Sequence, residues 1–242
     1  MTKIISESTN VNTFTVLRNS KEKIIKFSIP KSDNIIKTGL YVKDKITGIG
    51  TLSYIDPTTK IFASLGHEIL ESNTMTKFEI KDGTIYKAEV SSIIKSVVGS
   101  AGEKNATSDR ETIYGIVSDN KETGIYGQYT EDLSNLETIK VAKKEEVTTG
   151  KAIIKTVIKD NLVEEFTINI IKLDHNHKTK NILFEITDEN LLEKTGGIIQ
   201  GMSGSPIIQN NKLIGAVNYV VVNDPSKGYG IFIETMLEEG EN

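Results

Sequence analysis

Two short stretches of the sequence hold residue types that serve nucleophilic catalysis. Residues 201–206 read GMSGSP, so Ser203 lies in a tight turn of small residues just before apolar strand-forming residues. A serine hydroxyl is a weak nucleophile and needs a base within hydrogen-bond reach, usually a histidine. The chain has three histidines, and His67 directly follows Gly66 at the end of an apolar run. Ser203 and His67 are therefore the candidate nucleophile and base.

The glycines around Ser203 also predict a site for a developing negative charge. Gly201 and Gly204 allow a turn that points the serine hydroxyl outward. In such a turn the backbone N–H groups of Gly201 and Ser203 face one point, which is the geometry of an oxyanion hole. Neither a lysine followed by Ser or Thr nor a helix follows these glycines, which argues against a phosphate-binding loop.

Both stretches have a purely structural alternative. A turn rich in glycine and proline is typical of a hairpin corner, and a histidine at a strand end can simply bond a neighbouring carbonyl group. Ser205 is a rival nucleophile, although its place before Pro206 predicts that it leads into the strand. The Gly-x-Ser-x-Gly elbow of α/β-hydrolases is not matched, because the second residue after Ser203 is Ser205.

The other two histidines offer a weaker hypothesis. His175 and His177 lie beside Asp174 in the polar stretch LDHNHKTKN. A His-x-His pair can bind a metal ion, but no third ligand follows at a matching spacing, so an exposed turn is favoured. We expect no metal and no cofactor.

Composition narrows the class of protein. The chain of 242 residues has 29 Lys and Arg, 33 Asp and Glu, and no cysteine. Its net charge of −4 is spread along the chain, so we expect no nucleic-acid partner. No apolar run approaches the roughly 18 residues of a membrane span, so we expect a chain that is soluble as given. Without cysteine the chain has no disulfide framework.

The elements that would position these residues are mostly strands. Many short runs rich in Val, Ile, Thr and Tyr, separated by turn residues, predict an all-β sandwich or barrel. Candidate strands lie at 14–18, 23–29, 39–44, 48–55, 61–69, 84–98, 112–119, 124–130, 136–142, 150–160, 162–174, 181–188, 196–200, 206–210, 212–222 and 228–233. Residues 188–197 predict one short helix that ends at Gly196, and 234–241 a terminal helical turn. Residues 97–112 are expected to form a long loop.

A family resemblance adds to this interpretation. GMSGSP resembles the turn around the nucleophile of chymotrypsin-like peptidases, and KLIGAVNYVV and KGYGIFIETML are similar to the following strands and C-terminal helix of that superfamily. GLYVKD, GIGTLSYIDPTTKIFASLGHEI and the stretch TDENLLEKTGGIIQGMSGSPIIQNN, over roughly residues 36–240, resemble the peptidase domain of the SpoIVB sporulation peptidase family. The resemblance implies an all-β, chymotrypsin-like double β-barrel with a short C-terminal helix.

The resemblance also implies a catalytic triad and an acyl-enzyme mechanism. The base falls on His67, the nucleophile on Ser203 and the acid on Asp188 in ITDENLL. The alternative for Asp188 is the N-cap of the short helix. Asp82 and Asp119 are rival acids, although both are typical turn residues.

Substrate contacts follow from the same resemblance. The segment NYVVV, with Tyr219 and Val220, is expected to pair with an extended substrate by β-addition. Chymotrypsin-like pockets are read partly at the sixth residue before the nucleophile, which is Gly197. Because no acid lies there, we expect no preference for Arg or Lys before the cut.

The family carries a membrane anchor and a PDZ domain before its peptidase. Residues 1–35, with FTVLRNSKEKIIKFSIPKS, resemble the last hairpin of a PDZ domain, so we divide the chain into a PDZ remnant at 1–35 and a peptidase domain at 36–242. The resemblance implies sporulation signalling, with a protein substrate, in the extracytoplasmic space between the mother cell and forespore membranes. The rival hypothesis is a catalytically silent or zymogen-like peptidase fold that binds a protein partner.

Overall fold

The structure is a computed structural model that describes residues 11–18, 21–28, 31–32, 35–36, 45–71 and 75–241. The chain forms two compact units, residues 1–47 and 48–242. In the first unit β1 (Val11–Arg18) pairs antiparallel with β2 (Lys21–Ser28), and β3 (Lys31–Ser32) with β4 (Ile35–Ile36). Its relation to a PDZ domain stays a prediction. The strand expected at 39–44 lies outside the described residues.

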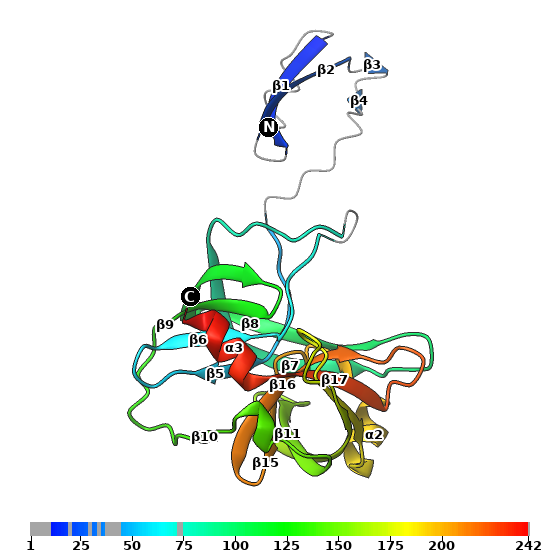
Figure 1. The fold of residues 1–242 in the computed structure, drawn as a ribbon. Coiled ribbons are helices and arrows are strands. Elements are labelled where there is room, and N and C mark those ends of the chain that lie inside the picture. The colour runs from blue at the N-terminus through cyan, green and yellow to red at the C-terminus, as the bar shows by residue number, and fades with distance from the viewer. Residues whose placement is uncertain are drawn as a thin grey trace. The chain divides into compact units, whose positions relative to one another are not determined.

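The second unit holds the remaining strands and helices (Figure 1). Its strands are β5 (Leu52–Ile55), β6 (Ile61–Ser64), β7 (Gly83–Ile94), β8 (Gly102–Lys121), β9 (Gly124–Tyr129), β10 (Lys140–Val141), β11 (Gly150–Val157), β12 (Val163–Leu173), β13 (Ile182–Ile186), β14 (Ile199–Gln200), β15 (Pro206–Gln209), β16 (Lys212–Val220) and β17 (Lys227–Phe232). Its helices are the 3-10 turn η1 (Lys144–Glu146), α2 (Glu189–Thr195) and α3 (Ile233–Gly240).

Six of these strands close a barrel. The order is β16–β15–β11–β12–β13–β17, and β17 pairs back onto β16. Every second side chain of a barrel strand faces the interior. On β13, for example, Ile182, Phe184 and Ile186 are buried, while Leu183 and Glu185 between them are partly exposed. The closed barrel supplies the larger of the hydrophobic cores.

β10 pairs with β16 of the barrel. The remaining six strands form an open, curved sheet that makes up the second half of the double barrel. Its order is β14–β8–β9–β6–β5, with β7 also paired to β8. Phe62, Val117 and Ile125 pack in its core. The C-terminal helix α3 connects the two sheets, because its Met236 carbonyl accepts a hydrogen bond from Tyr54 Oη of β5 at 3.2 Å. The predicted all-β, chymotrypsin-like double barrel with a C-terminal helix is confirmed.

The short helix near Ser203 also forms as expected. Asp188 caps the start of α2, since its side chain accepts the amide of Leu191. Gly196 ends the helix in the left-handed region at φ 68°, where a glycine has no Cβ penalty.

The expectation of a long loop at 97–112 is wrong. Only 95–101 connects β7 to β8, and β8 then runs from Gly102 to Lys121 along β7 with three register shifts. Side chains on both faces of this ribbon are largely exposed. Because neither face needs to be apolar, the ribbon lacks the hydrophobic alternation by which a strand is recognised in a sequence.

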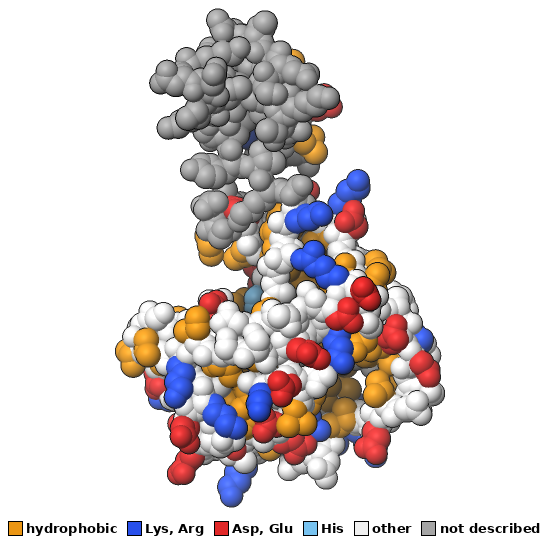
Figure 2. All heavy atoms as spheres, turned by 180° about the vertical axis from the view of Figure 1, so that it is seen from behind, with side chains coloured by type: hydrophobic (Ala, Val, Ile, Leu, Met, Phe, Trp, Pro, Cys, Tyr) orange, Lys and Arg blue, Asp and Glu red, His pale blue; other side chains and the backbone are white. Residues whose placement is uncertain are grey.

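Charged side chains of both signs are mixed on the surface of the second unit. On the face in Figure 2, Lys and Arg side chains lie among Asp and Glu side chains, with hydrophobic groups between them. Within the described part of the chain, no helix is both long enough and apolar enough to span a membrane.

Candidate active site

The turn that carries Ser203 connects β14 to β15 and requires its glycines. Gly201 and Gly204 have φ angles of 92° and 94°, which residues with a Cβ rarely adopt. A Cβ on Gly204 would lie 1.9 Å from the Thr51 carbonyl oxygen and 2.6 Å from the Leu65 nitrogen. The turn therefore packs directly against backbone of the other half of the double barrel.

Two backbone amides of the turn are left available. Among the described residues, the N–H groups of Gly201 and Ser203 have no hydrogen-bond acceptor. Nearly all buried amides in proteins are paired, so two free amides in one turn are unusual. The carbonyl groups of the same residues are engaged: Thr51 N donates to Ser203 O at 2.8 Å, and Thr51 Oγ1 to Gly201 O at 2.8 Å. Gly201 and Ser203 are the residues whose amides the sequence predicts as oxyanion donors, and that role stays a prediction.

The structure separates the two candidate serines. Ser203 is partly exposed, and its hydroxyl donates to the Asn218 carbonyl of β16 at 3.1 Å. Ser205 is fully buried, and its hydroxyl donates to Thr156 Oγ1 at 3.0 Å. Only Ser203 is placed where a substrate could reach it.

His67 follows β6 through a sharp turn in which Leu65 and Gly66 both have positive φ, 70° and 68°. Its Nδ1 lies 2.8 Å from the carbonyl oxygen of Glu68. A carbonyl group only accepts hydrogen bonds, so Nδ1 carries the proton and Nε2 has the free lone pair of a base. The ring stacks on Tyr219 with centroids 5.3 Å apart.

Asn218 forms hydrogen bonds to Ser203 and to Gly66, the residue before His67. Its side-chain amide donates to Thr179 O at 2.7 Å and to Gly66 O at 3.4 Å, while its backbone carbonyl holds Ser203. Ser203 and His67 thus meet at the end of β16. The serine hydroxyl donates to Asn218 and not to the imidazole in this arrangement. Such catalytic hydrogen bonds often form only when substrate binds.

Glu68 adds negative charge beside the base. One of its carboxylate oxygens is buried with no hydrogen-bond partner among the described residues. Burial raises the pKa of the neighbouring Tyr219, and the Glu68 charge raises that pKa further.

The structure does not bring Asp188 to His67. Asp188 Oδ1 accepts the Leu191 amide at 3.0 Å, and Oδ2 accepts the Thr167 amide of β12 at 3.4 Å. His67 lies beside β16, which is separated from β13 by β17. Among the described residues no hydrogen bond joins Asp188 to the imidazole. Its carboxylate serves as the helix cap that was the alternative interpretation.

The rival acids are not at the site either. Asp82 and Asp119 are exposed. Asp119 accepts the Ser118 hydroxyl at 2.7 Å. In the part of the chain that the structure describes, neither forms a hydrogen bond or ion pair with His67.

The expected substrate strand has a free edge. Tyr219 and Val220 pair on one side with Tyr229 and Gly228 of β17. On the other side, β15 and β10 pair with β16 only as far as Ala216, within the described residues. The unpaired edge leaves room for an extended peptide beside Ser203.

Gly197 is tightly packed against Pro225. Its φ is 136°, and a Cβ there would lie 2.2 Å from the Pro225 carbonyl oxygen. Its own carbonyl accepts the Thr195 hydroxyl at 2.6 Å. The backbone is thus fixed at the position that would form part of the specificity pocket, and it presents no side chain.

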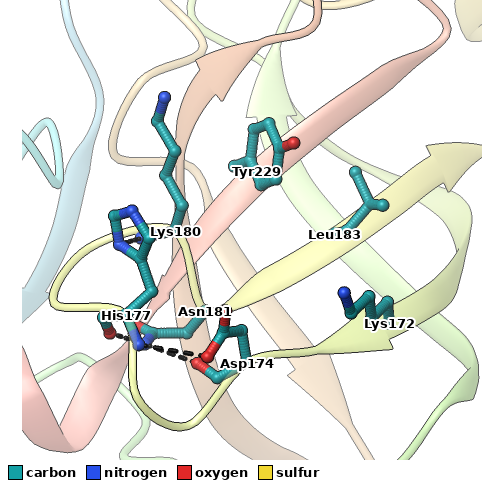
Figure 3. Close-up of a pocket in the computed structure, with 7 residues that line it drawn as sticks. All are labelled: Lys172, Asp174, His177, Lys180, Asn181, Leu183 and Tyr229. Atoms are coloured by element: carbon teal, nitrogen blue, oxygen red, sulfur yellow. Dashed lines mark hydrogen bonds between the residues drawn. The ribbon is translucent and has the colours of Figure 1, made fainter.

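A cavity of about 280 Å³ opens beside β13 and β17 (Figure 3). Its lining consists of Lys172, Asp174, His177, Lys180, Asn181, Leu183 and Tyr229. His177 Nδ1 accepts the amides of Thr179 and Lys180 at 3.1 and 3.0 Å, so this histidine stabilises its loop. Among the described residues no cluster of three His, Cys, Asp or Glu side chains could hold a metal ion.

The same loop adjoins the substrate strand. Lys180 Nζ lies 5.0 Å from the ring centroid of Tyr219 and 5.4 Å from that of Tyr229. Thr179 supplies the carbonyl group that holds Asn218. The loop that contains His175 and His177 therefore helps to hold β16 in place.

Two residues close to Ser203, Asn218 and Lys104, were not predicted from the sequence. Asn218 interrupts the apolar strand LIGAVNYVV, and a polar residue inside such a run is a signal that could have been used. Lys104 is buried next to the nucleophile turn, and nothing local in the sequence distinguishes it from the surface lysines.

One family model matches most of the chain. The model of the SpoIVB peptidase family, peptidase S55, matches residues 34–237. The chain matches none of the curated proteins with which it was compared.

Proposed function

Because the chain belongs to the SpoIVB peptidase family, we propose that it is a serine endopeptidase that cleaves a protein substrate through an acyl-enzyme. The observation that carries the proposal is the convergence of Ser203 and His67 on Asn218 and Tyr219 of β16. A partly exposed serine, a histidine with a free Nε2 and two unpaired amides are the parts that acyl transfer needs.

In the proposed mechanism Ser203 Oγ attacks the scissile carbonyl group while His67 Nε2 takes its proton. The imidazolium then gives that proton to the leaving amine, and water repeats the sequence to release the acyl group. The amides of Gly201 and Ser203 stabilise the oxyanion, and losing one such donor costs about 10²–10³ in turnover. The Glu68 carbonyl keeps the imidazole in the reactive tautomer.

The role of Asp188 as triad acid stays a prediction from the family resemblance, and Asp188→Asn tests it. Asparagine can still cap α2 with its side-chain oxygen. From the contacts of Asp188 we expect kcat to stay within about tenfold of the unchanged chain. Asp188→Ala should lower the free energy of unfolding by about 1 kcal/mol. A fall of about 10⁴ in kcat for Asp188→Asn, with the fold intact, would instead identify the triad acid.

The chain is expected to show no preference for Arg or Lys before the cut. A pocket for Arg or Lys needs a carboxylate, and Gly197 brings none. A peptide library digested by the chain and read by mass spectrometry should show no enrichment of Arg or Lys at that position. Strong selection for a basic residue would contradict the assignment of Gly197 to the pocket.

The proposed biological setting follows from the family alone. We place the substrate among regulators of an intramembrane protease, in the space between the mother cell and forespore membranes. Incubation of the purified chain with an unfolded protein substrate tests the enzymatic part. Cleavage that requires Ser203 supports a peptidase.

One observation favours a second candidate, a silent or zymogen-like module that binds a protein partner. The Ser203 hydroxyl donates its hydrogen bond to the Asn218 carbonyl group and not to His67. A folded chain that cuts no substrate but binds a protein through the free edge of β16 would support this alternative.

A further inference from the structure

Lys104 of β8 is a buried lysine that lies behind the nucleophile turn. Its side chain is 5% exposed. Its ammonium nitrogen donates to Thr156 Oγ1 of β11 at 2.9 Å and to Gly201 O at 3.2 Å. It therefore connects the open sheet to the closed barrel at the turn that carries Ser203.

The lysine has no negative partner. Within the described residues, no carboxylate lies at salt-bridge distance from its ammonium nitrogen. The groups that face it are the Thr156 hydroxyl and the Gly201 carbonyl, and its pairing partner on β7 is Ile93. Burial lowers the pKa of Lys104 to about 7. Keeping an unpaired cation in such a place costs stability.

A residue that lowers the stability of the fold in this way is better explained by a role in the reaction. The Gly201 carbonyl already accepts a hydrogen bond from Thr51 Oγ1, so the turn does not depend on Lys104 for a partner. Thr156 Oγ1 likewise accepts a hydrogen bond from Ser205. What Lys104 alone supplies is a positive charge, held at the carbonyl group of the residue whose amide would face the oxyanion.

We propose that Lys104 is a positioning and electrostatic residue of the oxyanion hole, whose buried ammonium holds the Gly201 carbonyl and stabilises the negative charge of the tetrahedral intermediate directly by its own charge. The inference rests on the proposed peptidase function. In this proposal Lys104 does not contact the substrate. The oxyanion would be the negative partner that Lys104 lacks in the resting site. The attraction between two opposite charges is strong in a protein interior that excludes water.

The test compares Lys104→Met with the unchanged chain in the rate at which a fluorophosphonate probe labels Ser203. Methionine fills a similar volume without charge. We expect labelling and peptide kcat to fall by about tenfold to thirtyfold, with KM unchanged. The thermal midpoint should stay equal or rise, because replacing an unpaired buried charge by an apolar group is commonly neutral or stabilising. A merely structural lysine would not lower activity while raising stability.

The matched control is Lys155→Met on β11. Lys155 neighbours Thr156 in sequence, but its side chain is 39% exposed and pairs with Glu165. This variant should label at the rate of the unchanged chain. Equal rates for Lys104→Met and the unchanged chain would overturn the inference, as would a parallel loss of stability and activity.

A second measurement needs no variant. The labelling rate of the unchanged chain should decline above pH about 7, as Lys104 loses its proton. A rate that stays level up to pH 9 would overturn the inference even if Lys104→Met does not fold. Absence of any label on Ser203 in the unchanged chain is a different result, which defeats the proposed peptidase function itself and the inference with it.

Discussion

Replacing Ser203 by alanine is expected to reduce peptide hydrolysis by roughly 10⁴- to 10⁶-fold. The residual rate would come from substrate binding and the oxyanion donors, which remain in place. The Ser203 side chain makes one hydrogen bond, to the Asn218 carbonyl, and is partly exposed. The thermal midpoint should therefore change by only a few degrees. Initial rates on one peptide, with circular dichroism of both chains, check the expectation.

Ser205→Ala is the matched variant for that experiment. Ser205 lies in the same turn but is fully buried against Thr156. Its loss should cost about 1 kcal/mol of unfolding free energy and leave Ser203 able to react. A Ser203→Ala chain that still cuts, beside an inactive but folded Ser205→Ala chain, would transfer the role of nucleophile to Ser205.

Gly204→Ala is expected to destabilise the chain by roughly 3–5 kcal/mol and to abolish activity. The added Cβ would lie 1.9 Å from the Thr51 carbonyl oxygen and 2.6 Å from the Leu65 nitrogen. Both neighbours are backbone atoms, so neither can move away as a side chain could. Relief of the clash must shift the turn of Ser203 or the segment that leads to His67. Denaturant unfolding and peptide cleavage measure the two effects.

Gly99→Ala separates the clash from backbone strain. Gly99 also has a positive φ, 86°, but no atom lies within 4 Å of its Cβ position. Only the cost of the left-handed backbone then applies, which is about 1 kcal/mol. Equal destabilisation by the two substitutions would show that the turn at Gly204 is less tightly packed than described here.

Local chemistry made part of the site predictable from the sequence. The glycines around Ser203 predicted a turn with free amides, and the structure has positive φ at Gly201 and Gly204. Gly196 predicted the end of α2. In each case the signal lies within a few residues of the feature, because a glycine marks a backbone conformation that other residues avoid.

Contacts between residues far apart in the sequence could not be predicted from such local signals. Lys104 becomes part of the site only because β8 passes behind a turn 97 residues further along the chain. Asn218 holds residues from three separate segments. The strand expected at 112–119 lies within β8, but its first part at 102–111 was missed because a ribbon with two exposed faces needs no hydrophobic alternation.

The case of Asp188 shows that a sequence motif does not determine where a residue lies relative to the paired strands. Its role was taken from the family motif ITDENLL, whereas its place in space follows from β12, β13 and α2. The strand order puts β17 between it and the base. The position of a carboxylate relative to His67 depends on which strands pair, and sequence spacing does not determine that.

The most direct test of the central claim is to treat the purified chain with a fluorophosphonate probe and to locate the adduct by mass spectrometry. The claim is that Ser203 and His67 form a working nucleophile and base at the end of β16. It predicts a single adduct on Ser203 that is lost in His67→Ala while that variant remains folded. A folded chain that carries no adduct, or one that still labels on Ser203 without His67, would contradict it.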